Sequence, residues 1–112
     1  MKVRAVHKNA RMTPRKLRLV ATLVRGMSVT EADAQLSFMS GKGPKIIRQV
    51  LTSAVANARE NNGADAEKLT VSKIEVNEGL KLRRFNPVSR GMAHPYTKRM
   101  SHVTVVVEDK EA

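Results

Sequence analysis

Cysteine is absent from this chain of 112 residues, which excludes a disulfide framework and thiolate metal sites. Aromatic side chains are scarce, because Phe38, Phe85 and Tyr96 are present without any tryptophan. Proteins that bind single-stranded nucleic acid usually stack bases on an aromatic platform, which this chain is too poor in aromatics to build. The longest uncharged apolar stretch is about as long as one strand, so we expect no membrane-spanning segment.

Acidic residues are in the minority, with 10 of them against 21 lysines and arginines, and the formal net charge is +11. Such an excess destabilises a compact chain by self-repulsion, so a polyanion is the natural partner. Nucleic acid, an anionic membrane surface and an acidic protein are the candidates. The scarcity of aromatics favours folded or duplex nucleic acid held by its backbone. No apolar run near the N-terminus is long enough for a signal peptide, so we expect a cytoplasmic location.

The basic residues gather in two segments that contain no acid, residues 1–30 and 79–107. A solvated face is the ordinary explanation of such a pattern. Here, however, no acid in the same segment can pair with the arginines, and the arginine fork matches phosphate oxygens. We therefore predict RNA contacts from both segments. The predicted RNA-binding residues are Lys8, Arg11, Arg15, Lys16, Arg18, Arg25, Lys81, Arg83, Arg84, Arg90, His94, Lys98 and Arg99.

The first part of the chain has the spacing of a short strand followed by helices. Alternation over residues 2–7 predicts an edge strand. Thr13 and Pro14 are typical of a helix start, and Gly26 can end that helix. Ser28 and Glu31 form a capping-box pattern that opens a second helix.

A third, longer helix is predicted to begin at Pro44 and to end at Asn61-Asn62-Gly63. Gly41-Lys42-Gly43 precedes it as a turn between helices, and it is too short for a phosphate-binding P-loop.

Alternating residues predict two further strands, over residues 69–78 and 100–108, and the segment between them is unusual. Residues 79–99 are too many for an ordinary hairpin loop, and their apolar side chains are too thinly spaced to close a core. Pro87 and Pro95, with Gly91 between them, suit a turn near a tip. Ten extended residues span roughly 30 Å. We therefore predict a long basic β-hairpin, rather than a disordered loop, which an external partner must order.

Catalytic and metal chemistry find no support in the sequence. His7, His94 and His102 lie in three separate segments, with no acid at ligand spacing. We expect no enzyme, no metal and no cofactor, and we place His94 with the RNA contacts and His102 on the sheet.

Several short motifs occur in an order and at a spacing that are specific in combination. They are Arg11–Val20, Ala56-Asn57-Ala58, Asn62-Gly63-Ala64, Val76-Asn77-Glu78-Gly79, Arg84-Phe85-Asn86-Pro87, Arg90-Gly91 and Lys98–Val107. In these motifs the chain resembles the bacterial large-subunit ribosomal protein L twenty-two family over nearly its whole length. At the tip it departs from that family, which commonly has basic residues where Val88 and Met92 stand.

The resemblance implies an α+β fold and a place in the ribosome. Residues 1–112 would form one domain, in which three helices pack on a small three-stranded antiparallel sheet in the order strand, three helices, two strands. Residues 80–101 would form the extended hairpin. The implied partners are several domains of the large-subunit (23S) RNA, neighbouring ribosomal proteins and the nascent peptide, with the chain a monomer that joins early in assembly. The hairpin tip would line the peptide exit tunnel through Pro87, Val88, Ser89, Arg90, Gly91, Met92 and Ala93.

Two other classes compete with this interpretation. An architectural DNA-binding protein with a proline-tipped basic arm could wedge Phe85 between base steps, although the sequence lacks a clear dimer core. A small nuclease would need a carboxylate cluster, and here the acids avoid the basic segments.

Overall fold

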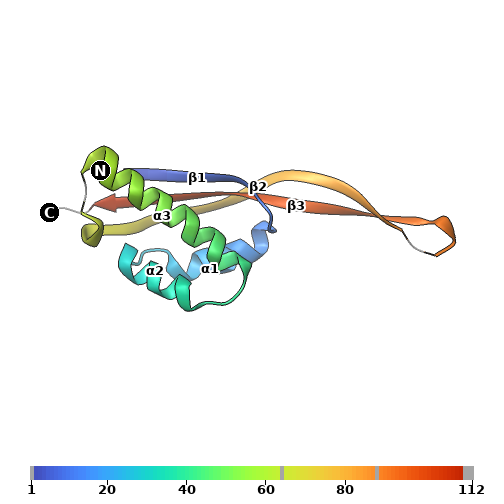
Figure 1. Cartoon of the computed structure of the whole chain (residues 1–112), viewed down its shortest axis with the longest axis horizontal. Helices are drawn as coiled ribbons and strands as arrows, with labels where there is room; N and C mark the ends of the chain where they lie inside the picture. Colours follow the sequence, from blue (N-terminus) through green and yellow to red (C-terminus); the bar gives the residue numbers. More distant parts are fainter. Residues whose placement is uncertain (1, 64, 88, 110–112) are drawn as a thin grey trace.

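The computed structural model of the chain describes residues 2–63, 65–87 and 89–109. Strand β1 (Lys2–Ala10) is followed by helices α1 (Pro14–Val24), α2 (Val29–Phe38) and α3 (Lys42–Asn62). Strands β2 (Leu69–Pro87) and β3 (Ala93–Asp109) complete the fold, with short 3-10 turns at Ala66–Lys68 and Ser89–Gly91. This order confirms the predicted α+β fold with a long hairpin extension (Figure 1).

The sheet has the order β1-β3-β2, and both pairings are antiparallel. β1 is therefore an edge strand, as predicted. Val103, Val105 and Val107 of the central strand are fully buried, because alternate residues of a strand point to the same face. Helix α3 packs along β1 and β3, and α1 packs against β2, so the helices cover that apolar face (Figure 1).

The helix ends largely follow the predicted signals. Ser28 Oγ accepts a hydrogen bond from the Glu31 backbone N–H at 3.3 Å, which is the first half of the capping box. Gly63 ends α3 in the left-handed conformation at φ 64°, where a glycine costs least. Thr13 does precede α1, but its side chain makes no capping hydrogen bond.

Two boundaries differ from prediction. Helix α3 begins at Lys42 rather than at Pro44, so Gly43 lies in its first turn. A Cβ on Gly43 would approach the side chains of Met12 and Val20 to 3.3 Å, and the glycine therefore lets this turn pack closely. Strand β1 continues beyond His7 to Ala10 through an irregularity in its pairing with β3, and Asn9 within it has φ 58°.

Beyond the pair Ala10↔Ser101, only β2 and β3 continue, paired as far as Pro87↔Ala93. We call residues 80–100 the arm and the remainder the body. The arm projects from one end of the body (Figure 1). The molecule measures 67 × 26 × 18 Å, and its radius of gyration is 17.0 Å. A compact chain of this length would have a radius of gyration of about 13 Å.

The arm has no core of its own. Every arm residue whose burial is described is exposed or half-buried, whereas the body contains one cluster of buried apolar residues. Over the described ranges, no helix is both long and apolar enough to cross a membrane.

Candidate nucleic-acid interface

The first basic segment lies around the start of α1. Arg11, Arg15 and Lys16 are exposed there, and Lys8 is exposed on the irregular end of β1. Helix α1 has no acid in its first turn, so the positive end of the helix dipole adds to these charges. The result is a surface suited to anions.

Arg18 and Arg25 hold α1 against the sheet, a role that the sequence analysis missed. Arg18 donates through Nε and Nη2 to the Val76 carbonyl oxygen at 3.1 and 3.0 Å. Arg25 donates through Nη2 to the Ile74 carbonyl oxygen at 2.8 Å. Both carbonyls belong to the edge strand β2, where an unpaired backbone group needs a partner. Only the spacing of seven residues, which puts both arginines on one face of the helix, signalled a shared role.

The register of the arm puts cations on both of its faces. Residues directly opposite each other share a face, so Lys81, Arg83 and Arg99 lie together on one face. Arg84 and Lys98 lie on the other face, since they alternate with the first set. A ribbon charged on both faces can contact two nucleic-acid segments at once.

Like charges also face each other across the arm. Lys81 is directly opposite Arg99, a pairing that destabilises an isolated ribbon. Glu78 relieves this only partly, since its carboxylate lies 3.6 Å from Lys81 Nζ and both side chains are about half exposed. An anion bound from outside would stabilise this part of the arm.

The tip is a tight turn of exposed residues. Ser89–Gly91 form a 3-10 turn in which Arg90 has φ 63° and Gly91 has φ 69°. Pro87, Arg90, Gly91, Met92 and Ala93 are exposed. Val88 lies outside the described residues, as do the side chains of Ser89 and His94. The described tip residues are therefore accessible to a partner, and their tunnel-lining role stays a prediction.

The base of the arm is fixed by polar contacts. The Asn9 backbone N–H donates to His102 Nδ1 at 3.1 Å, and Asn9 Oδ1 accepts from the Leu80 N–H at 3.3 Å. Ser101 is buried, and its Oγ donates to the Met12 carbonyl oxygen at 2.6 Å. His102 lies on the sheet as expected. These contacts link β1 and the segment before α1 to the strands that form the arm.

The two basic segments, far apart in the sequence, meet at this base. Arg11 and Lys16 from the first segment and Lys98 and Arg99 from the second line one open cleft of about 540 Å³. Lys42 and Tyr96 also line it, and neither was among the predicted RNA-binding residues. The segment Gly41-Lys42-Gly43 was predicted as a turn, whereas Lys42 is the first residue of α3, and only the fold brings it to this cleft.

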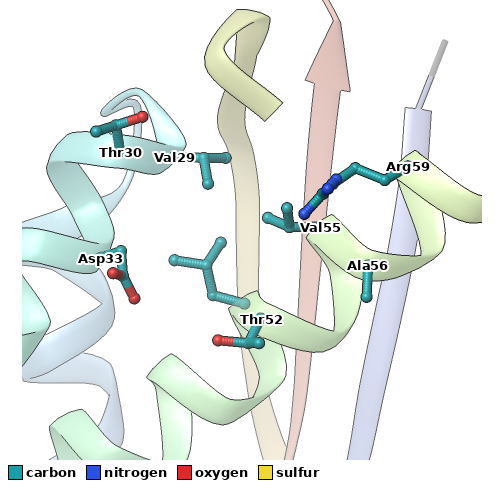
Figure 2. A pocket seen from close by; sticks show the side chains of 8 residues that line it. Val29, Thr30, Asp33, Thr52, Val55, Ala56 and Arg59 are labelled. Atoms are coloured by element: carbon teal, nitrogen blue, oxygen red, sulfur yellow. The ribbon is translucent and has the colours of Figure 1, made fainter. Parts of the chain in front are cut away.

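A second hollow lies between α2 and α3 on the body (Figure 2). Its volume is about 350 Å³, and its polar lining includes Thr30, Asp33 and Arg59. Asp33 is engaged by Arg48, whose Nε donates to Asp33 Oδ1 at 2.9 Å. That hydrogen bond and the carboxylate charge raise the pKa of Arg48 above its ordinary value. Among the described residues, no three His, Cys, Asp or Glu side chains gather as metal ligands would.

Known proteins resemble this chain along most of its length. The family model described as "Ribosomal protein L22p/L17e" matches residues 5–108. A "Large ribosomal subunit protein uL22" from Lacticaseibacillus casei is 53% identical over 108 residues, covering 96% of this chain and 92% of that protein. Proteins of the same name from Pediococcus pentosaceus and Latilactobacillus sakei are each 49% identical, over 96% and 93% of this chain and 91% and 89% of their own lengths.

Proposed function

The chain belongs to the ribosomal protein L22p/L17e family, and we propose that it is a structural constituent of the large ribosomal subunit that binds large-subunit RNA through the RNA phosphates. The proposed contacts are the exposed cations around the start of α1 and those on both faces of the arm. Lysine and arginine neutralise phosphates and release counterions, so affinity should fall steeply with salt. The work of such a protein is binding and shaping RNA, with no catalytic step.

One observation carries the proposal: the arm extends beyond the core and has cations on both faces. Ordering a chain segment costs on the order of 1–2 kcal/mol per residue in backbone entropy. A two-stranded ribbon without a core offsets this cost poorly. Phosphate contacts on both faces, with burial of Phe85 and Met92 against RNA, would offset it. The arm therefore fits between RNA segments, which it would bridge.

The family resemblance extends the proposal to the tunnel. We propose that the exposed turn around Arg90 and Gly91 lines the peptide exit tunnel and meets the nascent peptide. The length of 67 Å would let the tip reach inward while the body stays with neighbouring ribosomal proteins. Joining several RNA domains through one arm also suits an early part in subunit assembly. The chain would act as a monomer within a bacterial, and therefore cytoplasmic, ribosome.

The test is sucrose-gradient sedimentation of a cell lysate at moderate and then at high salt, with the chain followed by mass spectrometry. We expect the chain to sediment with the large subunit and to remain bound through the high-salt wash. An arm inserted between RNA segments can dissociate only when many contacts break at the same time. Chain that stays at the top of the gradient, or that modest salt removes, would contradict the proposal. Tighter binding to duplex DNA than to large-subunit RNA would favour the DNA-binding alternative.

A further inference from the structure

The cleft at the base of the arm has the size and the charge of a binding site. Its volume of about 540 Å³ lies within the range of small-ligand sites. The body forms one side and strand β3 of the arm forms the other. The charged and aromatic side chains that line it are Arg11, Lys16, Lys42, Tyr96, Lys98 and Arg99.

The positive charge of this cleft is uncompensated. No acidic residue lines it, and within the described part of the chain none of its five cations is in an ion pair. The Lys42 ammonium is held in place, since Nζ donates to the Arg11 carbonyl oxygen at 2.6 Å. A lysine has three donors, so two remain for a ligand. Five cations exceed what one phosphate would neutralise, which points to a ligand with several.

Two helix N-termini border the same cleft, and both carry cations where acids are favourable. Lys16 lies in the first turn of α1, and Lys42 is the first residue of α3. Neither helix has an acid in its first turn or a side chain that caps it. A cation at the positive end of a helix dipole is unfavourable, and a bound anion reverses this penalty. Gly43 permits the close packing that brings Lys42 to this position.

The arm side of the cleft is a free strand edge with an aromatic ring. Beyond Ser101, β3 no longer pairs with β1, so residues 96–99 pair only with β2. Tyr96 is 43% exposed and is the only tyrosine in the chain. A nucleic-acid base can stack on such a ring whatever its identity.

We propose that this junction cleft holds consecutive phosphates of an RNA strand that passes between body and arm, with one base of that strand against Tyr96. The inference rests on the proposed function and adds a defined site to it. The bound strand bridges Lys16 and Lys42 of the body to Lys98 and Arg99 of the arm. It therefore fixes the direction in which the arm leaves the body.

The test uses the full chain and two probes, the single-stranded hexaribonucleotide U6 and inorganic pyrophosphate. The variant Lys42→Gln removes a charge inside the cleft. Lys45→Gln removes the same charge from an exposed position on the same helix, outside the cleft lining. We expect Lys42→Gln to lower the affinity for both probes about fivefold, because a hydrogen bond to a charged group is lost. Lys45→Gln should lower the affinity for either probe by less than about twofold.

Tyrosine fluorescence reports on the cleft directly, because Tyr96 is the only tyrosine and the chain has no tryptophan. We expect U6 to quench the emission as a base stacks, and pyrophosphate to change it little. In the variant Tyr96→Leu, followed by NMR or calorimetry, the affinity for U6 should fall about fivefold or more, while the affinity for pyrophosphate should not change.

Three results would overturn the inference. Equal losses in Lys42→Gln and Lys45→Gln would show that only net charge matters. Unchanged emission with saturating U6 would show that no base reaches Tyr96. If Lys42→Gln weakened the binding of pyrophosphate but not that of U6, the cleft would be a site for free phosphate and not for an RNA strand. In each case the wild-type chain would still sediment with the large subunit, so the proposed function would stand.

Discussion

The same strand has opposite surroundings in the body and in the arm. In the body, alternate residues of β3 (Val103, Val105 and Val107) are fully buried beneath the helices. In the arm, the residues that continue this alternation, Pro95, Thr97 and Arg99, are exposed. Both parts pair antiparallel with β2, although the register shifts between Glu78 and Lys81, where the arm begins. Strand pairing is thus shared, while apolar burial is confined to the body. We therefore attribute folding stability to the body core, and RNA binding to the arm together with the exposed cations around the start of α1.

Arginines show the same division. In the body, Arg18 donates two hydrogen bonds to the Val76 carbonyl oxygen. In the arm, Arg83 is exposed. Among the described residues, Arg84 donates only to the carbonyl oxygen of its neighbour Arg83, at 3.0 Å. One residue type therefore serves packing in one region and remains available to a partner in the other.

The largest effect should come from the body core. Ile47 is fully buried in α3, and Ile47→Ala should lower the free energy of unfolding by about 2–5 kcal/mol, because burial is lost and a cavity remains. Urea denaturation followed by circular dichroism measures this. RNA affinity of the still-folded variant should stay within about twofold of wild type, and a larger loss would show that the two regions are coupled.

Removing charge from the arm should have the reverse effect. Replacing Arg83, Arg84 and Arg99 by Ala should weaken binding to large-subunit RNA roughly 10- to 100-fold and lower the slope of log affinity against log salt by about two to three. The melting temperature of the free chain should change little.

A charge-matched control replaces Lys2, Arg4 and Lys45, which are exposed on the body, by Ala. It should weaken binding far less than the arm variant does. If the arm variant melts much earlier than wild type, its arginines are structural and the division between arm and body is wrong.

Arg18 tests the boundary between the two roles. Arg18→Met keeps the aliphatic stem but loses both hydrogen bonds to Val76, so it should destabilise the body by about 1–2 kcal/mol. Arg15→Met, from the exposed neighbour, should cost less than about 0.5 kcal/mol. Thermal unfolding compares the two, and equal costs would show that the contact with β2 contributes nothing.

The smallest effect concerns the link at the base of the arm. Asn9→Gly keeps a residue that tolerates φ 58° but removes the acceptor for the Leu80 N–H. The Leu80 amide should exchange with solvent about fivefold faster, while global stability changes by less than about 0.5 kcal/mol. Hydrogen exchange followed by NMR checks this, and an unchanged rate would exclude the Asn9 side chain as the restraint.

Much of the fold could be predicted from the sequence because its signals are local. Three signals depend only on neighbours in the chain. They are the capping pair Ser28 and Glu31, the helix end at Gly63, and the buried valines at every second position from Val103 to Val107. The long hairpin was predicted from the number of residues between two strand signals, and β2 and β3 confirm it. Alternation of apolar and polar residues fades in the arm, yet backbone pairing continues to Pro87↔Ala93 without it.

The site was less accessible because it depends on contacts between distant segments. Arg18 and Arg25 were predicted from the sequence to bind RNA. Their hydrogen bonds to the sheet were not foreseen, because the carbonyl partners lie 58 and 49 residues away on β2. Lys42 donates to the Arg11 carbonyl oxygen, 31 residues away, and Gly43 lets the start of α3 pack closely on Met12. No local pattern encodes either arrangement.

We infer that the body folds by itself, whereas the arm is ordered by RNA. Limited trypsin digestion timed by mass spectrometry tests it most directly, since Lys81, Arg83, Arg84 and Lys98 place cleavage sites along the arm. In the free chain the first cuts should fall in the arm and leave the body intact, and in isolated large subunits the same sites should resist. An arm that resists trypsin in the free chain, or that is cut equally fast within the subunit, would contradict the account.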